Sequence, residues 1–148
     1  MKKISKHISY KEATHSNYAK QYKIANKPSD EHIENMELLA KKIFEPLREW
    51  VDAPIKVNSM FRSEKLNTGI KGSVTSSHLK GQAIDITSMG GKSNLEMFHY
   101  IKDNLDFDQL IWEFGYEPKW LHVSYISEKE NRKQVLVTKR AGVYYTWS

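Results

Sequence analysis

Apolar side chains recur at helical spacing between residues 29 and 50. Ser29 is a candidate N-cap, and Asp30 and Glu31 supply the negative charge that favours a first helical turn. Pro46 lies inside the pattern, so we expect the helix to be kinked or split there. The positions that would form its buried face are Ile33, Met36, Leu39, Ile43, Phe44, Leu47 and Trp50.

Short apolar runs separated by turn residues predict strands in the rest of the chain. Between them we expect a short helical turn over 62–67, a loop over 69–77 and a second helix from the cap Ser93 to about Asn104. This mixture predicts an α+β class, with a mainly antiparallel sheet and helices packed on one side. The predicted strands are Ile55–Met60, Ala83–Thr87, Asp108–Phe114, Trp120–Ile126, Val135–Thr138 and Val143–Trp147.

The first 28 residues are polar, with only scattered tyrosine and isoleucine. We expect an extended arm there, with room for one short helix around Tyr10 to Tyr18. The chain then divides into an N-terminal arm, 1–28, and a single domain, 29–148. A length of 148 residues suits one such domain with a moderate core.

Composition excludes several classes of protein. The absence of cysteine excludes a disulfide framework, cysteine zinc sites and cysteine nucleophiles. A net charge of +5 suits an anionic partner such as nucleic acid or an acidic wall polymer, and it equally serves solubility. The basic start, residues 1–16, is not followed by an apolar stretch, so we expect synthesis in the cytoplasm without a signal peptide. No apolar run is long enough to span a bilayer, and we expect no membrane partner.

The segment SSHLKGQAIDI, residues 76–86, carries most of the candidate chemistry. His78 and Asp85 lie seven residues apart, and Gly81 can make the turn between them. On a strand, Asp85 faces away from its apolar neighbours, which can anchor the strand in the core. His122 alternates with apolar residues in the same manner in the segment WLHVSY. Two imidazoles and one carboxylate form a zinc set that leaves the fourth position open, as a hydrolytic zinc requires.

A hydrolytic zinc also needs a general base that is not a ligand, and Glu113 is the first candidate. A hairpin with the four-residue loop 116–119 would place Glu113 directly opposite His122, with Cβ atoms about 5 Å apart. A register shifted by one residue would turn Glu113 away, and Glu117 in the turn is then the alternative. Arg62 is a candidate to bind a substrate carbonyl or carboxylate, or else a structural ion-pair partner.

The pattern Ser76-x-His78-x-x-Gly81-x-Ala83-x-Asp85, followed by Trp120-x-His122, resembles the zinc D-Ala-D-Ala carboxypeptidase family. That family includes peptidoglycan carboxypeptidases, D-Ala-D-Ala dipeptidases and phage L-alanyl-D-glutamate endolysins, and hedgehog signalling domains share its fold. The stretch VNSMFRSEKLNTGIKGS resembles the arginine-containing segment that precedes the family's first zinc histidine. The resemblance covers roughly residues 30–126 and, more weakly, the N-terminal arm.

This resemblance implies that zinc is bound by His78, Asp85 and His122, and that Arg62 binds substrate or stabilises the transition state. It also implies that Ser76 supports the zinc site through a hydrogen bond. Trp120 is expected either to line the cleft or to pack in the core. The implied function is hydrolysis of peptidoglycan stem peptides, as a D-Ala-D-Ala carboxypeptidase or an L-Ala-D-Glu endopeptidase. We expect a monomer that acts on the cell wall, either as a phage endolysin released by a separate pore or as a small bacterial or prophage enzyme.

Two departures from the family pattern bear on this expectation. Many members carry an acidic base three positions before the last histidine, where this chain has Lys119, so Glu113 or Glu117 must act instead. Met60 stands where many relatives have glycine and would narrow or reshape the cleft near Arg62. The Lys119 departure keeps a second class open, a zinc-binding module without catalysis. A basic virion or nucleic-acid-associated protein is a third class, although no stacking motif supports it and no nucleic-acid partner is expected.

Overall fold

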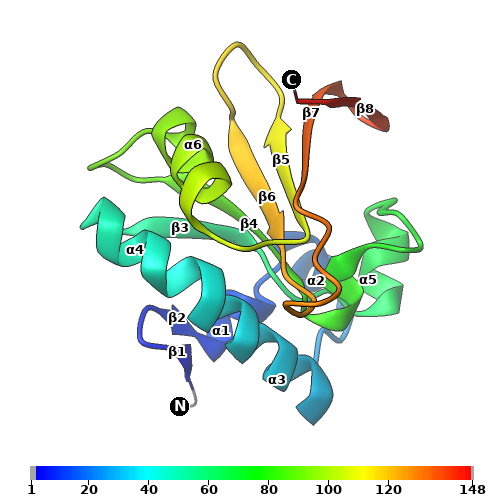
Figure 1. Ribbon diagram of the computed structural model, residues 1–148. Coiled ribbons are helices and arrows are strands. Elements are labelled where there is room, and N and C mark those ends of the chain that lie inside the picture. Colours follow the sequence, from blue (N-terminus) through cyan, green and yellow to red (C-terminus); the bar gives the residue numbers. More distant parts are fainter. Residues whose placement is uncertain (1–2, 148) are drawn as a thin grey trace.

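A six-stranded sheet in the order β3-β4-β6-β5-β7-β8 lies at the centre of the structure, a computed structural model that describes residues 3–147 (Figure 1). Neighbouring strands in this sheet are antiparallel except for β5 and β7, which run parallel. The prediction of an α+β domain with a mainly antiparallel sheet is therefore confirmed. The strands are β3 (Ile55–Ser59), β4 (Ala83–Ser88), β5 (Gln109–Glu113), β6 (Trp120–Ser124), β7 (Gln134–Arg140) and β8 (Val143–Thr146).

Helices cover one face of the sheet. Helix α6 (Asn94–Asn104) packs on β4, β5 and β6, and α4 (Glu45–Val51) packs against α6. Figure 1 shows α3 (Asp30–Leu39) running toward α4 along the same side. The buried side chains between these layers include Leu39, Ile43, Leu47, Ile84, Ile86, Phe98, Ile101, Leu121 and Val123. Because the apolar residues of β4 and β6 face this core, the alternate positions of both strands face the opposite side.

The long helix predicted from Ser29 is interrupted before Pro46, as expected. Ser29 caps α3, the five residues Ala40–Phe44 form a π-helical turn, η1, and α4 follows with Pro46 in its first turn. Proline has no N–H to donate to the carbonyl four residues earlier, and just before it the helix widens, with the Glu45 N–H donating to the Ala40 carbonyl five residues earlier. The interruption keeps one apolar stripe against the core.

The N-terminal segment differs from the extended arm that its composition predicts. It forms two paired strands, β1 (Lys3–Ser5) and β2 (Ile8–Ser9), and two short helices, α1 (Tyr10–Thr14) and α2 (Asn17–Gln21). The expectation of a single short helix was wrong because capping side chains, Ser9 and Ser16, start two separate helices. The few apolar residues of the segment, including Ile4, Ile8 and Ala13, lie in the main core.

The final hairpin, β7 and β8, turns at Ala141 and Gly142 as predicted. Its parallel pairing with β5 had no signal in the sequence. The connection 125–133 leads from the end of β6 to the start of β7, and an ion pair holds it against the sheet. Arg132 donates through Nε and one terminal nitrogen to both carboxylate oxygens of the buried Asp108, at 2.9 and 2.8 Å. Within residues 3–147, no helix combines the length and the apolar character needed to cross a membrane.

Candidate metal centre

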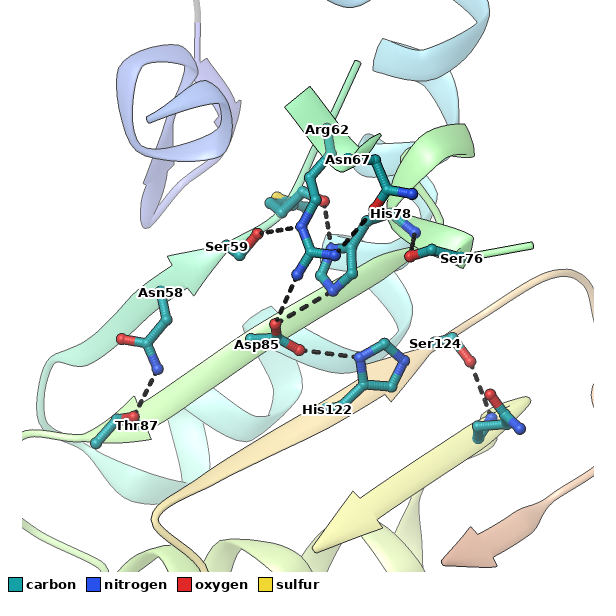
Figure 2. A network of polar contacts seen from close by, with 12 residues as sticks. Asn58, Ser59, Arg62, Asn67, Ser76, His78, Asp85, Thr87, His122 and Ser124 are labelled. Carbon is teal, nitrogen blue, oxygen red and sulfur yellow. Dashed lines mark hydrogen bonds and ion pairs between the residues drawn. The ribbon is translucent and has the colours of Figure 1, made fainter. Parts of the chain in front are cut away.

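Strands β4 and β6 hold Asp85 and His122 side by side. The two residues are directly opposed in the antiparallel ladder, and His122 Nδ1 lies 2.9 Å from Asp85 Oδ1 (Figure 2). Opposed residues on antiparallel strands share a face, and the neighbours Ile84 and Leu121 point into the core behind them. The alternation that predicted this arrangement is therefore realised on both strands.

His78 reaches the same place from η2 (Ser77–Lys80), a single 3-10 turn that immediately precedes β4. The Ser76 hydroxyl accepts a hydrogen bond from the His78 backbone N–H at 3.3 Å, so Ser76 supports the site by capping this turn. Gly81 then adopts a φ of +73°, and a Cβ at this position would lie 2.5 Å from the carbonyl oxygen of His32. Only glycine accommodates both constraints, which accounts for its place between the two candidate ligands.

The imidazole of His78 is buried and held in one tautomer. Its Nδ1 lies 2.6 Å from the carbonyl oxygen of Met60. Because a carbonyl can only accept, Nδ1 carries the proton and Nε2 presents a lone pair. Among residues 3–147, Nε2 has no hydrogen-bond partner, and it lies 3.2 Å from Asp85 Oδ2.

Electrostatics keep this pair in the form that binds a cation. Burial lowers the pKa of His78, which favours the neutral imidazole. Burial alone would raise the pKa of Asp85, but the hydrogen bond that the carboxylate accepts from His122 opposes this effect, and the pKa lies well below its usual range. A lone pair and a carboxylate oxygen thus face each other across 3.2 Å with no proton between them. A metal ion satisfies both, and the three residues fit one, since one ligand atom from each lies within 4.8 Å of the others.

Arg62 lies beside these residues and contacts Asp85. Its Nε donates to the Ser59 hydroxyl at 3.1 Å, and its two terminal nitrogens donate to Asn67 Oδ1 at 3.3 Å and to Asp85 Oδ2 at 3.5 Å (Figure 2). Burial lowers the pKa of Arg62, against the effect of the carboxylates of Asp85 and Glu113. Arg62 thus forms an ion pair with Asp85 and also lines the cleft beside the candidate ligands.

Asn67 is a part of the site that sequence reasoning missed. It lies in α5 (Glu64–Gly69), is 3% exposed, and donates through Nδ2 to the carbonyl oxygen of Ser73 at 2.8 Å. It thereby connects the Arg62 guanidinium to the loop that follows α5. No pattern in the sequence marks this role, because an asparagine in a short helix is more often a surface residue.

Glu113 lies on the same face as His122, although the predicted pairing was wrong. Glu113 pairs with Trp120, and Ile111 is the residue opposite His122. The connection 114–119 is longer than the predicted four-residue loop because Phe114 turns with a φ of +62° and Lys119 N–H donates to the Glu113 carbonyl at 3.0 Å. The partner moves by two residues, and an even shift preserves the face of the strand.

These side chains open into one cleft of about 700 Å³. It contains all three candidate ligands together with Arg62, Ser76, Glu113 and Trp120. Burial raises the pKa of Glu113 to about 7, with the Asp85 charge acting in the same direction. Glu117, the alternative base, is exposed in the turn and does not line the cleft.

The structure explains the two positions, Met60 and Lys119, at which the chain departs from the family pattern. The Met60 side chain is buried in the core and does not line the cleft, so the expectation that it narrows the cleft was wrong. Its carbonyl instead orients His78. Lys119 is exposed at the end of the loop, and Glu113 is the glutamate that enters the cleft.

Three clustered metal-ligand side chains with an ionisable carboxylate beside them are typical of a metal-dependent hydrolase. The chain belongs to the peptidase M15 family, whose sequence model matches residues 6–124. This match confirms the resemblance to zinc D-Ala-D-Ala carboxypeptidases and supports the classes hydrolase and metallopeptidase. No individually curated protein matches the chain.

Proposed function

We propose that the protein is a zinc-dependent peptidase that hydrolyses peptidoglycan stem peptides at the cell wall. The observation that carries the metal part of the proposal is the buried His78 Nε2, which faces an Asp85 carboxylate oxygen at 3.2 Å and has no hydrogen-bond partner in the described part of the chain. Leaving two buried acceptors opposed in this way is unfavourable unless a cation joins them. Membership of the peptidase M15 family supports the reaction class.

In this proposal His78, Asp85 and His122 hold the zinc ion. Zinc in such a three-ligand site supplies a Lewis acid and lowers the pKa of a water in the open position. The Met60 carbonyl fixes the tautomer of His78 and so presents Nε2 to the ion. Asp85, directly opposed to His122 on a stiff sheet, keeps the ligand geometry close to constant.

Glu113 is the proposed general base. A carboxylate with a pKa near 7 can accept a proton from the attacking water and return it to the leaving amine nitrogen at neutral pH. Its position in the cleft also supports catalysis over the alternative of a zinc-binding module without activity. Glu117 lacks this position, so we assign it no role in the reaction.

Arg62 is the proposed oxyanion and carboxylate binder. A guanidinium has five N–H groups, and Arg62 uses one each toward Ser59, Asn67 and Asp85. The remaining two have no partner within residues 3–147 and can donate to a substrate carbonyl or carboxylate in the cleft. The bonds to Ser59 and Asn67 orient the group before substrate arrives, which reduces the ordering that binding requires.

The test is incubation with muropeptides of known structure, followed by mass spectrometry of the products. We expect the zinc-loaded protein to cleave a stem peptide and a chelator to stop the reaction. The masses decide between loss of a terminal D-alanine and cleavage between L-alanine and D-glutamate. Zinc-loaded, folded protein that leaves every muropeptide intact would contradict the proposal and favour the zinc-binding module.

A further inference from the structure

The C-terminal hairpin forms one wall of the cleft, although it lies beyond the residues that the family model matches. From β7, β8 and the turn between them the lining includes Leu136, Ala141, Gly142 and Tyr144. The family match therefore gives no information on this wall.

Tyr144 stands in line with Glu113 across the sheet. Glu113 pairs with Trp120 on one side and with Thr138 on the other, and Thr138 pairs in turn with Tyr144. Residues paired in this way share a face, so Tyr144 faces the cleft from two strands away, roughly 10 Å between backbones. The small side chain of Thr138 between them leaves room for the phenol to extend over it.

Polar contacts of Thr138 fix the backbone of the hairpin that carries Tyr144. The buried Thr138 hydroxyl lies 2.7 Å from the Arg140 carbonyl oxygen and 2.6 Å from that of Val143. These contacts close the turn around Gly142, whose φ of +79° suits glycine. Burial and the charges of Glu113 and Asp85 raise the pKa of Tyr144, so its hydroxyl stays protonated and able to donate.

We propose that Tyr144 is a substrate-binding residue, whose hydroxyl donates a hydrogen bond to an oxygen of the bound stem peptide. This inference rests on the proposed function. In the strand order, β8 lies on the other side of β6 from Arg62, which contacts β3 and β4. A peptide bound over the metal ligands is then contacted by Arg62 at one side and by Tyr144 at the other.

Tyr145 provides a matched control. It is 54% exposed against 51% for Tyr144, but it alternates to the opposite face and lines a separate hollow with Val137 and Trp147. Tyr144→Phe and Tyr145→Phe each remove one hydroxyl from an exposed ring of the same hairpin. Both variants should keep the wild-type melting temperature, and this is checked first by circular dichroism.

The experiment measures kcat and KM on the muropeptide that the wild type cleaves, and the dissociation constant of that peptide in a Glu113→Gln background. We expect Tyr144→Phe to weaken binding about 3- to 10-fold, the scale of one hydrogen bond. The ring resonances of Tyr144 should also shift when the peptide is added. Tyr145→Phe should leave kcat, KM and the dissociation constant unchanged.

Two outcomes would overturn the inference, and they are distinguishable. If the wild type cleaves the peptide and Tyr144→Phe matches both wild type and Tyr145→Phe, Tyr144 does not bind substrate and the proposed function stands. If the wild type neither cleaves nor binds any stem peptide, the proposed function fails and the role of Tyr144 fails with it.

Discussion

His78 Nε2 lies 3.2 Å from Asp85 Oδ2, and both atoms are acceptors. The single N–H of the neutral imidazole is on Nδ1, where it donates to the Met60 carbonyl. This relationship leads to the first prediction. Purified protein should bind about one zinc ion per chain, and His78→Ala or His122→Ala should lose most of it. Elemental analysis after dialysis measures the content. A wild-type zinc content in the double variant His78→Ala, His122→Ala would refute the assignment of these ligands.

The second prediction concerns Arg62. Arg62→Lys keeps the positive charge but loses the fork that donates to Ser59, Asn67 and Asp85 at once. We expect kcat/KM to fall roughly 10- to 100-fold, the scale of a hydrogen bond to a charged group, while zinc content stays at the wild-type level. Arg48→Lys, on α4 and outside the cleft, is the control and should have no effect. If Arg62→Lys has wild-type kinetics, Arg62 has a structural role and does not bind substrate.

The third prediction concerns stability. Asp108 is buried and accepts three hydrogen bonds from Arg132, two from the guanidinium and one from the backbone N–H, and these bonds lower its pKa. Since the folded-state pKa is depressed, this contribution is present above the ordinary aspartate range and is lost as pH falls through the folded-state value. Asp108→Asn should therefore destabilise the protein by about 1–3 kcal/mol at pH 7 and by less at low pH.

Chemical denaturation at several pH values measures this effect. Asp103→Asn is the control, because Asp103 forms an exposed pair with Lys102 and should contribute little. Equal destabilisation of Asp108→Asn at pH 7 and at pH 3 would show that the side chain stabilises the fold by packing and not by charge.

Local patterns predicted the parts of the site that depend on one strand at a time. Alternation with buried neighbours placed Asp85 and His122 on the polar face of the sheet, and Gly81 marked the turn that brings in His78. Each of these follows from side-chain direction on a strand or from a backbone angle, which neighbouring residues determine. The same reasoning located the interruption near Pro46.

The parts that sequence reasoning missed depend on contacts between distant segments. The pairing of Glu113 with Trp120 follows from the left-handed conformation of Phe114. A bulky residue rarely adopts this conformation, and no sequence pattern predicts it here. The hydrogen bond from His78 to Met60 uses a backbone carbonyl, which is the same for every residue type. The parallel pairing of β7 with β5 likewise depends on where a loop takes the chain.

The fourth prediction concerns the stability of the metal-free protein. Burial raises the folded-state pKa of Glu113 to about 7, so ionising this carboxyl opposes folding. The protonated Glu113 carboxyl contributes to the stability of the folded state; this contribution is fully present below the usual glutamate pKa and is lost as the pH rises through about 7. Glu113→Gln should thus raise the melting temperature of the metal-free protein at pH 8 and change it little at pH 4. Glu117→Gln, in the exposed turn, should change it at neither pH.

The last prediction concerns the base. Glu113→Gln keeps the size of the side chain but cannot accept a proton at neutral pH, so zinc and peptide should bind normally while kcat falls by roughly 100-fold or more. Wild-type kcat/KM should decline as the pH drops through the Glu113 pKa, and this acidic limb should vanish in the variant. Its midpoint should lie at or below about 7, because a nearby cation stabilises the carboxylate. Glu117→Gln should retain wild-type kinetics. An inactive Glu117→Gln beside an active Glu113→Gln would mean that the turn, and not the sheet, supplies the base.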